Sequence, residues 1–352
     1  MISNVRLQHF RSYMDSAFEF GDGVNIIVGP NGSGKTNLLE ALLVLARGGS
    51  YRVGDNDLMA FGADWSRIDG VVDGTQERSI ILKKSALLQK TYTVGAKTYS
   101  RLPEKQKLPM VLFEPNHLML LQGPPEGRRM YLDDILEQIK PGYNVFRKNY
   151  KRVLAQRNTL LKTPHTTKQE FFPWNLRLSE LGAVVYRARR ELVDEISAHL
   201  QDTYKQLAAT NTKIGVSYES RLTEVDYESQ LMRVLEDNYH SDASRGFTSF
   251  GPHRDDIIVR FGGVPAALTA SRGESRTATL ALKILEAQIL ERTRNQKPLM
   301  LLDDVFSELD GVRRQSLTSH LQNFQTFLTT TDADIVVKHF TRCNILPIQQ
   351  TN

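Results

Sequence analysis

A run of eight residues near the start of the chain has the types and the spacing of a phosphate-binding loop. The run that fits the pattern G-x-x-x-x-G-K-[ST] is Gly29-Pro30-Asn31-Gly32-Ser33-Gly34-Lys35-Thr36. Glycines let backbone N–H groups curl around phosphate oxygens, at a helix N-terminus whose dipole favours anions. Lys35 would reach the β- and γ-phosphates, and the Thr36 hydroxyl would bind Mg²⁺. The alternative is an ordinary glycine-rich turn between a strand and a helix.

Two carboxylates end a second apolar run, Leu299 to Leu302, which is followed directly by Asp303 and Asp304. In a parallel sheet this order puts Asp303 at the carboxyl edge, beside the phosphate loop. We therefore expect Asp303 to be the acid on the metal side. Asp304 would orient or deprotonate the attacking water. Such a strand is also often followed by nothing more than a turn.

Ser271-Arg272-Gly273-Glu274 precedes a helical pattern. By default a serine at this place simply caps a helix. Ser271 and Gly273 would also suit the γ-phosphate of a nucleotide that another subunit supplies. The residues alone leave both interpretations open.

The elements that must position these residues alternate between strand and helix patterns. We expect strands over 2–10, 24–28, 79–82, 91–94, 255–261, 299–302 and 324–328, and helices over 37–46, 274–292 and 311–322. After Pro124-Pro125 the pattern becomes one of long helices. The sequence thus predicts an α/β protein with a second, mainly helical lobe.

The helical stretch carries most of the positive charge. Residues 128–190 hold fourteen Lys and Arg and five Asp and Glu, a net +9, while the whole chain has +5. In the helix expected over 145–162, one side is apolar and the other side is basic. The basic side holds Arg147, Lys148, Lys151 and Arg152. We expect this side to contact DNA, although a solvated face or a surface for an acidic protein partner would have the same charge.

Arg157 falls on the apolar side of that helix, where an isolated charge would be costly. We expect it to pair with an acid such as Asp133, Asp134 or Glu137. A second long helix is expected from Trp174 to about Ala209, packed along the first.

Composition excludes several classes of protein. No apolar run reaches the roughly 18 residues of a membrane span, and the first residues have no apolar signal segment. The single cysteine, Cys343, excludes an intramolecular disulfide and fits a reducing compartment. We expect a cytoplasmic protein that has no membrane partner.

Taken in this order, the three motifs resemble an ABC-type ATPase head, with Ser307-Glu308-Leu309-Asp310 as its D-loop. Further stretches resemble the RecF family of DNA-repair ATPases, whose fold is similar to SMC heads. These stretches are Phe10-Arg11-Ser12-Tyr13, Ser50-Tyr51-Arg52, Phe113-Glu114-Pro115, Arg128-Arg129, Gln156-Arg157-Asn158 and Gly251-Pro252-His253-Arg254-Asp255-Asp256. The matches run from residue 6 to about 332.

The resemblance implies an ATPase lobe of residues 1–115 and about 245–352, with a helical arm over about 116–244. It implies ATP and Mg²⁺ as cofactors, and it implies that Arg11 touches the nucleotide phosphates. The signature serine of one subunit would close on the nucleotide of its partner, so that ATP drives formation of a homodimer. Double- and single-stranded DNA would be bound at gaps, and RecR and RecO would be partners in helping RecA to load.

Two departures from the wider ABC pattern suggest slow hydrolysis, so that the nucleotide acts as a timer. Asp304 stands where the catalytic acid is usually a glutamate, and residues 329–332 lack the switch histidine. A transporter ATPase subunit or another SMC-like ATPase remains the alternative. Thr36 and Ser271 are 235 residues apart, which is long for a transporter subunit. His253 is expected to be structural more often than catalytic.

Overall fold

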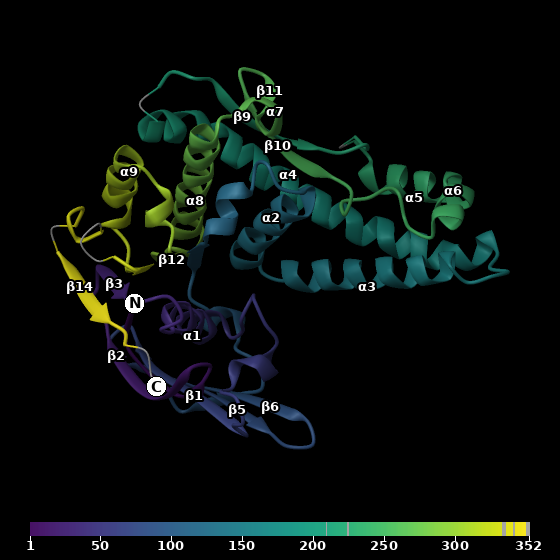
Figure 1. Cartoon of the computed structure of the whole chain (residues 1–352). Helices are drawn as coiled ribbons and strands as arrows, with labels where there is room; N and C mark the ends of the chain where they lie inside the picture. Colours follow the sequence, from purple (N-terminus) through teal and green to yellow (C-terminus); the bar gives the residue numbers. More distant parts are fainter. Residues whose placement is uncertain (209, 224, 333–335, 341, 350–352) are drawn as a thin grey trace. The chain divides into compact units, whose positions relative to one another are not determined.

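The computed structural model describes residues 1–208, 210–223, 225–332, 336–340 and 342–349, and it forms two compact units (Figure 1). Unit 1 comprises Met1–Leu118 and Glu286–Asn352, and unit 2 comprises Met119–Leu285. Each unit has its own sheets and its own buried core.

Unit 1 contains a parallel sheet in the strand order β14-β3-β13-β12-β8. Its strands are β3 (Val24–Val28), β8 (Met110–Phe113), β12 (Leu299–Asp303), β13 (Thr326–Thr330) and β14 (Cys343–Pro347). The central strands β12 and β13 are buried along their whole length, as their continuous apolar or threonine-rich sequences require.

An antiparallel sheet completes unit 1, in the order β2-β1-β4-β5-β6-β7. Its strands are β1 (Ile2–Phe10), β2 (Tyr13–Glu19), β4 (Trp65–Val72), β5 (Gln76–Lys84), β6 (Leu88–Val94) and β7 (Lys97–Tyr99). The helix α1 (Lys35–Arg47) packs with side chains of both sheets in one core. Its apolar residues point in all directions, which is why it is buried on nearly every side.

Unit 2 is mainly helical. Its helices are α2 (Pro125–Ile139), α3 (Tyr143–Leu161), α4 (Phe172–Ala208), α5 (Tyr227–Asp237), α6 (Tyr239–Arg245) and α7 (Ala266–Thr269). A small antiparallel sheet joins them, formed by β9 (Ile214–Glu219), β10 (Asp256–Phe261) and β11 (Val264–Pro265). The chain then passes into α8 (Arg272–Arg294), and α9 (Gly311–Leu321) follows in unit 1.

The observed division of the chain differs from the expected one at its second boundary. Residues 245–285 were expected in the ATPase lobe, but they belong to unit 2. The reason is strand pairing: β10 pairs along its whole length with β9, from Asp256 opposite Glu219 to Phe261 opposite Ile214. A pairing between distant segments leaves no local signal in the sequence.

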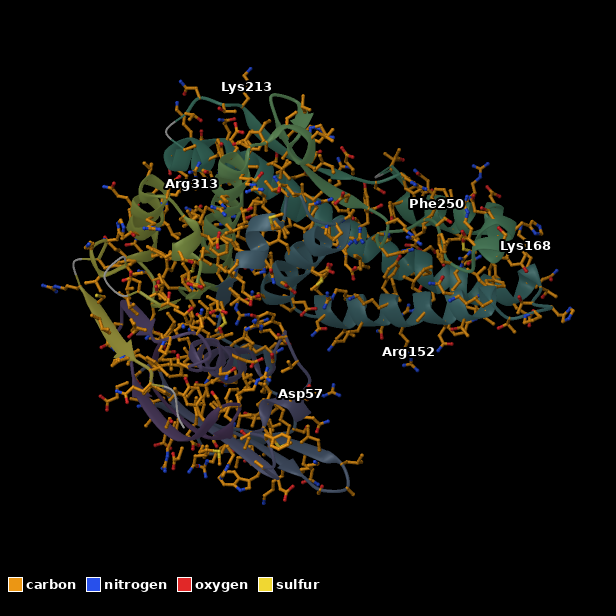
Figure 2. The ribbon with its side chains drawn as sticks, viewed as in Figure 1. Asp57, Arg152, Lys168, Lys213, Phe250 and Arg313 are labelled. Carbon is orange, nitrogen blue, oxygen red and sulfur yellow. The ribbon has the colours of Figure 1, made fainter. Side chains whose placement is uncertain are left out.

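The two long helices expected for the arm are present. The helix α4 has 37 residues and packs along α3. The expected end at Ala209 lies outside the described residues. Figure 2 labels Lys168 near the turn between the two helices and Arg152 on α3. Each helix of the pair buries the side chains along one of its sides and exposes those along the opposite side.

The predicted partner of Arg157 is wrong. Its guanidinium is fully buried and forms an ion pair with Asp242 at 2.9 Å, with further hydrogen bonds to Asn175 and Thr248. Asp133 is instead held by Arg189 and Arg147. Arg157 lies about 15 Å along the helix from Arg147. At that distance it reaches α6 rather than α2.

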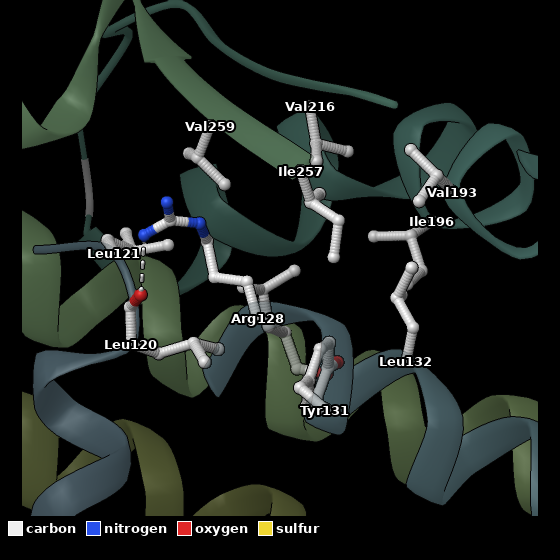
Figure 3. Close-up of a pocket in the computed structure, with 11 residues that line it drawn as sticks. Leu120, Leu121, Arg128, Tyr131, Leu132, Val193, Ile196, Val216, Ile257 and Val259 are labelled. Carbon is white, nitrogen blue, oxygen red and sulfur yellow. Dashed lines mark hydrogen bonds between the residues drawn. The ribbon is translucent and has the colours of Figure 1, made fainter. Parts of the chain in front are cut away.

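A pocket in the interior of unit 2 is lined by apolar side chains from α2, α4 and the small sheet, around Arg128 (Figure 3). The Arg128 guanidinium donates to the carbonyls of Leu120 and Gly123 and to both carboxylate oxygens of Asp256. Because its charged group is already bonded, we interpret this pocket as part of the core.

Candidate nucleotide-binding site

The phosphate loop leaves the carboxyl end of β3 and enters α1 at Lys35, as the sequence predicts. Gly34 has φ +100°, in the left-handed region, and a Cβ atom there would meet the Tyr13 hydroxyl at 2.9 Å. That hydroxyl donates to the Gly34 carbonyl at 3.0 Å. Both constraints require glycine, so Tyr13 and Gly34 fix the shape of the loop together.

Two polar groups in the loop are suited to a phosphate. The Lys35 ammonium donates to the carbonyls of Gly29 and Pro30, at 2.7 and 2.9 Å. Burial lowers the pKa of Lys35, while the charges of Asp304 and Asp303 act in the opposite direction. The Ser33 hydroxyl is buried and has no hydrogen-bond partner among the described residues. A phosphate would supply the acceptor that the Ser33 hydroxyl lacks, and it would compete with the loop carbonyls for the Lys35 ammonium.

Asp303 lies where the sequence places it, at the carboxyl end of β12 and in contact with the loop. The Thr36 hydroxyl is 3.0 Å from both carboxylate oxygens of Asp303. Thr329, its neighbour in register on β13, donates to the same carboxylate at 2.8 Å. Three elements that are distant in the sequence therefore converge on this carboxylate.

This pair fits Mg²⁺, which prefers hard oxygen ligands and near-octahedral geometry. The Thr36 hydroxyl and the Asp303 carboxylate would supply two such ligands. Within the part of the chain that the structure describes, no group of three His, Cys, Asp or Glu could hold a metal by itself. The remaining positions would therefore fall to the phosphates and to water, as is usual for Mg²⁺ with a nucleotide.

Asp304 has φ +51°, a left-handed conformation that is uncommon for residues other than glycine. Its backbone N–H donates to the Thr329 hydroxyl at 2.9 Å. The Ser307 hydroxyl donates to the Asp304 carbonyl at 2.7 Å and also lies 3.2 Å from the Asp304 carboxylate. Strained backbone of this kind clusters at functional sites. The strain turns the Asp304 side chain away from the strand direction and toward the segment that begins the expected D-loop.

Arg11 was expected at the phosphates, and the structure gives it another contact. Its Nε donates to Glu40 on α1 at 2.7 Å, and the Glu40 side chain is almost fully buried. Arg11 also has a left-handed backbone, with φ +52°. The structure therefore brings Arg11 to α1 but engages its guanidinium with Glu40.

Arg52 and Glu114 were not assigned a role from the sequence, and both lie beside Asp303. The Arg52 guanidinium is 3.8 Å from Asp303 and 3.7 Å from Glu114. Glu114 follows β8, whose last registered pair with β12 is Phe113 opposite Leu302. The signal was available: Glu114 ends a short apolar strand, which is the pattern that identified Asp303.

Ser271 lies in unit 2, exposed, directly before α8. Its hydroxyl accepts from the Glu274 backbone N–H at 3.1 Å, and Glu274 accepts from the Ser271 backbone N–H at 2.8 Å. This is a capping box, which accounts for the residue types as a helix start. Gly273 lies in the first turn. The role of both residues toward a partner's nucleotide stays a prediction.

The predicted basic face of α3 is present at three of its four positions. Lys148, Lys151 and Arg152 are exposed. Arg147 is different: its guanidinium pairs with Asp133 at 3.1 Å and with Glu137 at 2.7 Å. We therefore no longer expect Arg147 to contact DNA, because its guanidinium is already ion-paired with two carboxylates of unit 2.

His253 has a structural environment. Its two ring nitrogens are 2.6 Å from the Tyr150 hydroxyl and 3.0 Å from the Thr248 carbonyl. Burial lowers the pKa of His253 to about 4, so the ring is neutral at pH 7. A neutral imidazole with both ring nitrogens hydrogen-bonded stabilises the segment around His253.

A phosphate loop after β3, with an acid at the end of β12 in the same parallel sheet, is typical of P-loop nucleotide-binding proteins. The chain also matches the family profile described as "RecF/RecN/SMC N terminal domain" over residues 1–350. It belongs to this family and, within it, to RecF.

The curated relatives support this placement over nearly the whole chain. The chain is 34% identical over 343 residues to "DNA replication and repair protein RecF" of Heliobacterium modesticaldum, covering 94% of this chain and 92% of the relative. It is 32% identical over 345 residues to the protein of the same name from Halothermothrix orenii, covering 94% and 92%.

Solved structures agree. The chain is similar to "the recombination mediator protein RecF-ATPrS in RecFOR pathway", with a TM-score of 0.86, 28% identity and coverage of 98% of this chain and 96% of that chain. An SMC head bound to the C-winged helix domain of ScpA shares the fold, with a TM-score of 0.55 and 14% identity over 99% and 94%. These matches favour RecF over the transporter subunit that the motifs alone left open. Among the described helices, none is both long enough and apolar enough to cross a membrane.

Proposed function

We propose that this protein is an ATP-dependent DNA-binding protein of replication and recombinational repair. The observation that carries the proposal is the convergence of Thr36, Asp303 and Thr329 beside a phosphate loop whose buried Ser33 hydroxyl has no hydrogen-bond partner among the described residues. This site occurs in a chain that resembles RecF proteins along 94% of its length. A similar solved structure is named as RecF-ATP in the RecFOR pathway, which supports ATP as the nucleotide. In this proposal RecR and RecO are partners, and together they help RecA to load.

In this proposal the residues of unit 1 bind the nucleotide and promote slow hydrolysis. Lys35 and the loop amides bind the phosphates, and the bound Mg²⁺ would offset their negative charge. Thr329 and Thr36 orient the Asp303 carboxylate. Asp304 would orient or deprotonate the attacking water, and the Ser307 hydroxyl lies 3.2 Å from its carboxylate. Because an aspartate is one methylene shorter than a glutamate, we expect the protein to keep ATP long enough to act as a switch.

ATP would join two copies of the chain into a clamp on DNA, with Ser271 of each copy completing the partner's site. The exposed hydroxyl at the start of α8 is compatible with that role. Ser271→Arg should leave ATP binding by the monomer intact and abolish ATP-dependent dimerisation on a sizing column. If the variant still dimerises with ATP, Ser271 is only a helix cap.

The exposed basic face of α3 would contact the DNA backbone. Lys148, Lys151 and Arg152 project from one side of the helix, and the segment 140–169 contains no acidic residue. Phosphate contacts of this kind release counterions. Duplex affinity should therefore fall with salt, at a log–log slope of about −0.9 per contact.

The experiment that tests the function measures binding of a gapped duplex by fluorescence anisotropy with ATP, ADP or no nucleotide. We expect tight binding with ATP alone. Reversing Lys148, Lys151 and Arg152 to Glu should weaken binding and flatten the salt slope while ATP affinity stays unchanged. Equal binding under all three nucleotide conditions would contradict the proposed function.

A further inference from the structure

The segment 247–254 links α6 to β10 and contains most of the motif Gly251-Pro252-His253-Arg254-Asp255-Asp256, which the nucleotide site does not use. Each of two aromatic rings in this segment has an arginine guanidinium over its face. The Arg254 guanidinium carbon lies 4.6 Å from the centre of the Phe247 ring. The Arg221 guanidinium carbon lies 5.7 Å from the centre of the Phe250 ring. The two rings are three residues apart along the chain.

The segment is held rigidly. Arg254 Nε donates to the Thr248 carbonyl at 3.1 Å, so the guanidinium is fixed both by this bond and by the Phe247 ring. His253 bridges Thr248 and Tyr150. Gly251 has φ +124°, and a Cβ atom there would meet the Tyr150 hydroxyl at 2.7 Å. A fixed, exposed guanidinium plane loses little conformational freedom when a ligand stacks on it.

The surface is positively charged as well as aromatic. Phe247 is 39% exposed, and Arg221, Arg245 and Arg254 are all exposed. The only acid between 239 and 254 is Asp242, which is fully buried and paired with Arg157. In Figure 2, Phe250 is labelled on a different side of unit 2 from Arg152 of the α3 face. This surface is therefore separate from the expected duplex contact.

We infer that this surface, formed by Phe247, Phe250, Arg221, Arg245 and Arg254, binds single-stranded DNA. Exposed bases would stack on the outer faces of the two arginine–phenylalanine pairs, and Arg245 would contact the backbone phosphates. Bases within a duplex stack on one another and are not available to such a platform, so the surface selects unpaired nucleotides. The inference rests on the proposed DNA-binding function. It adds a second contact, for the unpaired strand of a gap.

The test compares Arg254→Lys with wild type in the full-length protein with ATP. Lysine keeps the charge but lacks the planar group that stacks. We expect affinity for a labelled dT oligonucleotide to fall about tenfold, as for the loss of one stacked base, while affinity for a blunt duplex stays unchanged. The matched control is Arg233→Lys on α5, whose side chain is 84% exposed and which should change neither affinity.

A second variant, Phe247→Leu, removes the ring under Arg254 and should weaken the same oligonucleotide binding. Thermal unfolding checks that both variants fold. The inference is overturned if single-strand affinity is unchanged in both variants, or if single-strand and duplex affinity fall equally, since charge alone would then explain the surface. It is likewise overturned if the variants instead lose binding to RecR. If wild type binds no duplex with ATP, it is the proposed function that fails.

Discussion

Charged side chains are hydrogen-bonded differently in the nucleotide site of unit 1 and in the arginine network of unit 2. In unit 2, the buried Asp133 accepts two bonds from Arg189, one from Tyr143 and one from Arg147. In unit 1, the hydrogen bonds of Lys35 within the described part of the chain go to loop carbonyls alone. The Arg52 guanidinium lies 3.7 Å from Glu114 and 3.8 Å from Asp303.

The difference indicates which charges are structural. A buried ion with every position bonded holds the fold together, and removing one partner leaves a charge without compensation. In the loop of unit 1, the buried Ser33 hydroxyl has no hydrogen-bond partner among the described residues. Incomplete bonding at a site of this kind is suited to an incoming ligand. Four predictions test this contrast.

The largest effect is expected in unit 2, at Arg157. Arg157→Leu removes the bonds to Asp242, Asn175 and Thr248 and leaves the buried Asp242 carboxylate without its positive partner. We expect a loss of about 3–5 kcal/mol in unfolding free energy, measured in urea. The control Arg177→Leu breaks an exposed pair with Glu180 and should cost at most about 0.5 kcal/mol. Equal losses in the two variants would show that the network adds little.

Lys35→Ala should have the next largest effect, and it should act on ligand binding rather than on stability. The phosphates would lose a charged donor worth about 1.5–3 kcal/mol, so we expect ATP affinity to fall about a hundredfold in calorimetry. The unfolding free energy should hardly change, because Lys35 donates to the carbonyls of its own loop, at Gly29 and Pro30. Lys97→Ala, at an exposed position on β7, is the control. Undiminished affinity in Lys35→Ala would contradict the assignment of the loop.

His253 should make unit 2 sensitive to acid. Its pKa is about 4 in the fold, against 6.5 when unfolded, so the unfolded chain binds the extra proton first. The stability that this residue contributes is present above about pH 6.5 and is lost as the pH falls toward 4. Between pH 7 and 5 we expect a decrease of about 2 kcal/mol, which His253→Gln should remove. An identical pH dependence in the variant would show that His253 does not cause it.

The smallest effects should appear at Arg52 and Glu114, with opposite signs. Arg52→Gln leaves two carboxylates uncompensated, so less Mg²⁺ should be needed for half-maximal ATP binding. Glu114→Gln leaves the positive charge of Arg52 without this carboxylate, so that it repels Mg²⁺. More Mg²⁺ should then be needed for half-maximal ATP binding. We expect shifts of about threefold, because Arg52 is 40% exposed and solvent screens its charge. Arg67→Gln, an ion-paired arginine with 45% exposure on β4, is the control. Shifts in the same direction would contradict this account.

Local patterns predicted part of the elements, but they did not predict the strands β2, β4, β8, β9 and β14. The expected bounds of β1 and β3 are confirmed, and the loop and Asp303 follow from motifs with known strand contexts. What failed depends on distant pairing. The partner of Arg157 is 85 residues away, and β10 joins unit 2 through β9. Arg147 looked like surface charge on the helical wheel, because the wheel does not show the two acids that α2 brings to it.

Calorimetric titration of ATP with Mg²⁺ and with EDTA, on wild type, Asp303→Asn and Asp304→Asn, tests the central claim most directly. Thr36 and Asp303 are assigned as the metal ligands, and Asp304 is assigned to the water. We predict that Mg²⁺ strengthens ATP binding in wild type and in Asp304→Asn but not in Asp303→Asn. If Mg²⁺ strengthens binding in Asp303→Asn as much as in wild type, the metal site is not at the end of β12 and the account is contradicted.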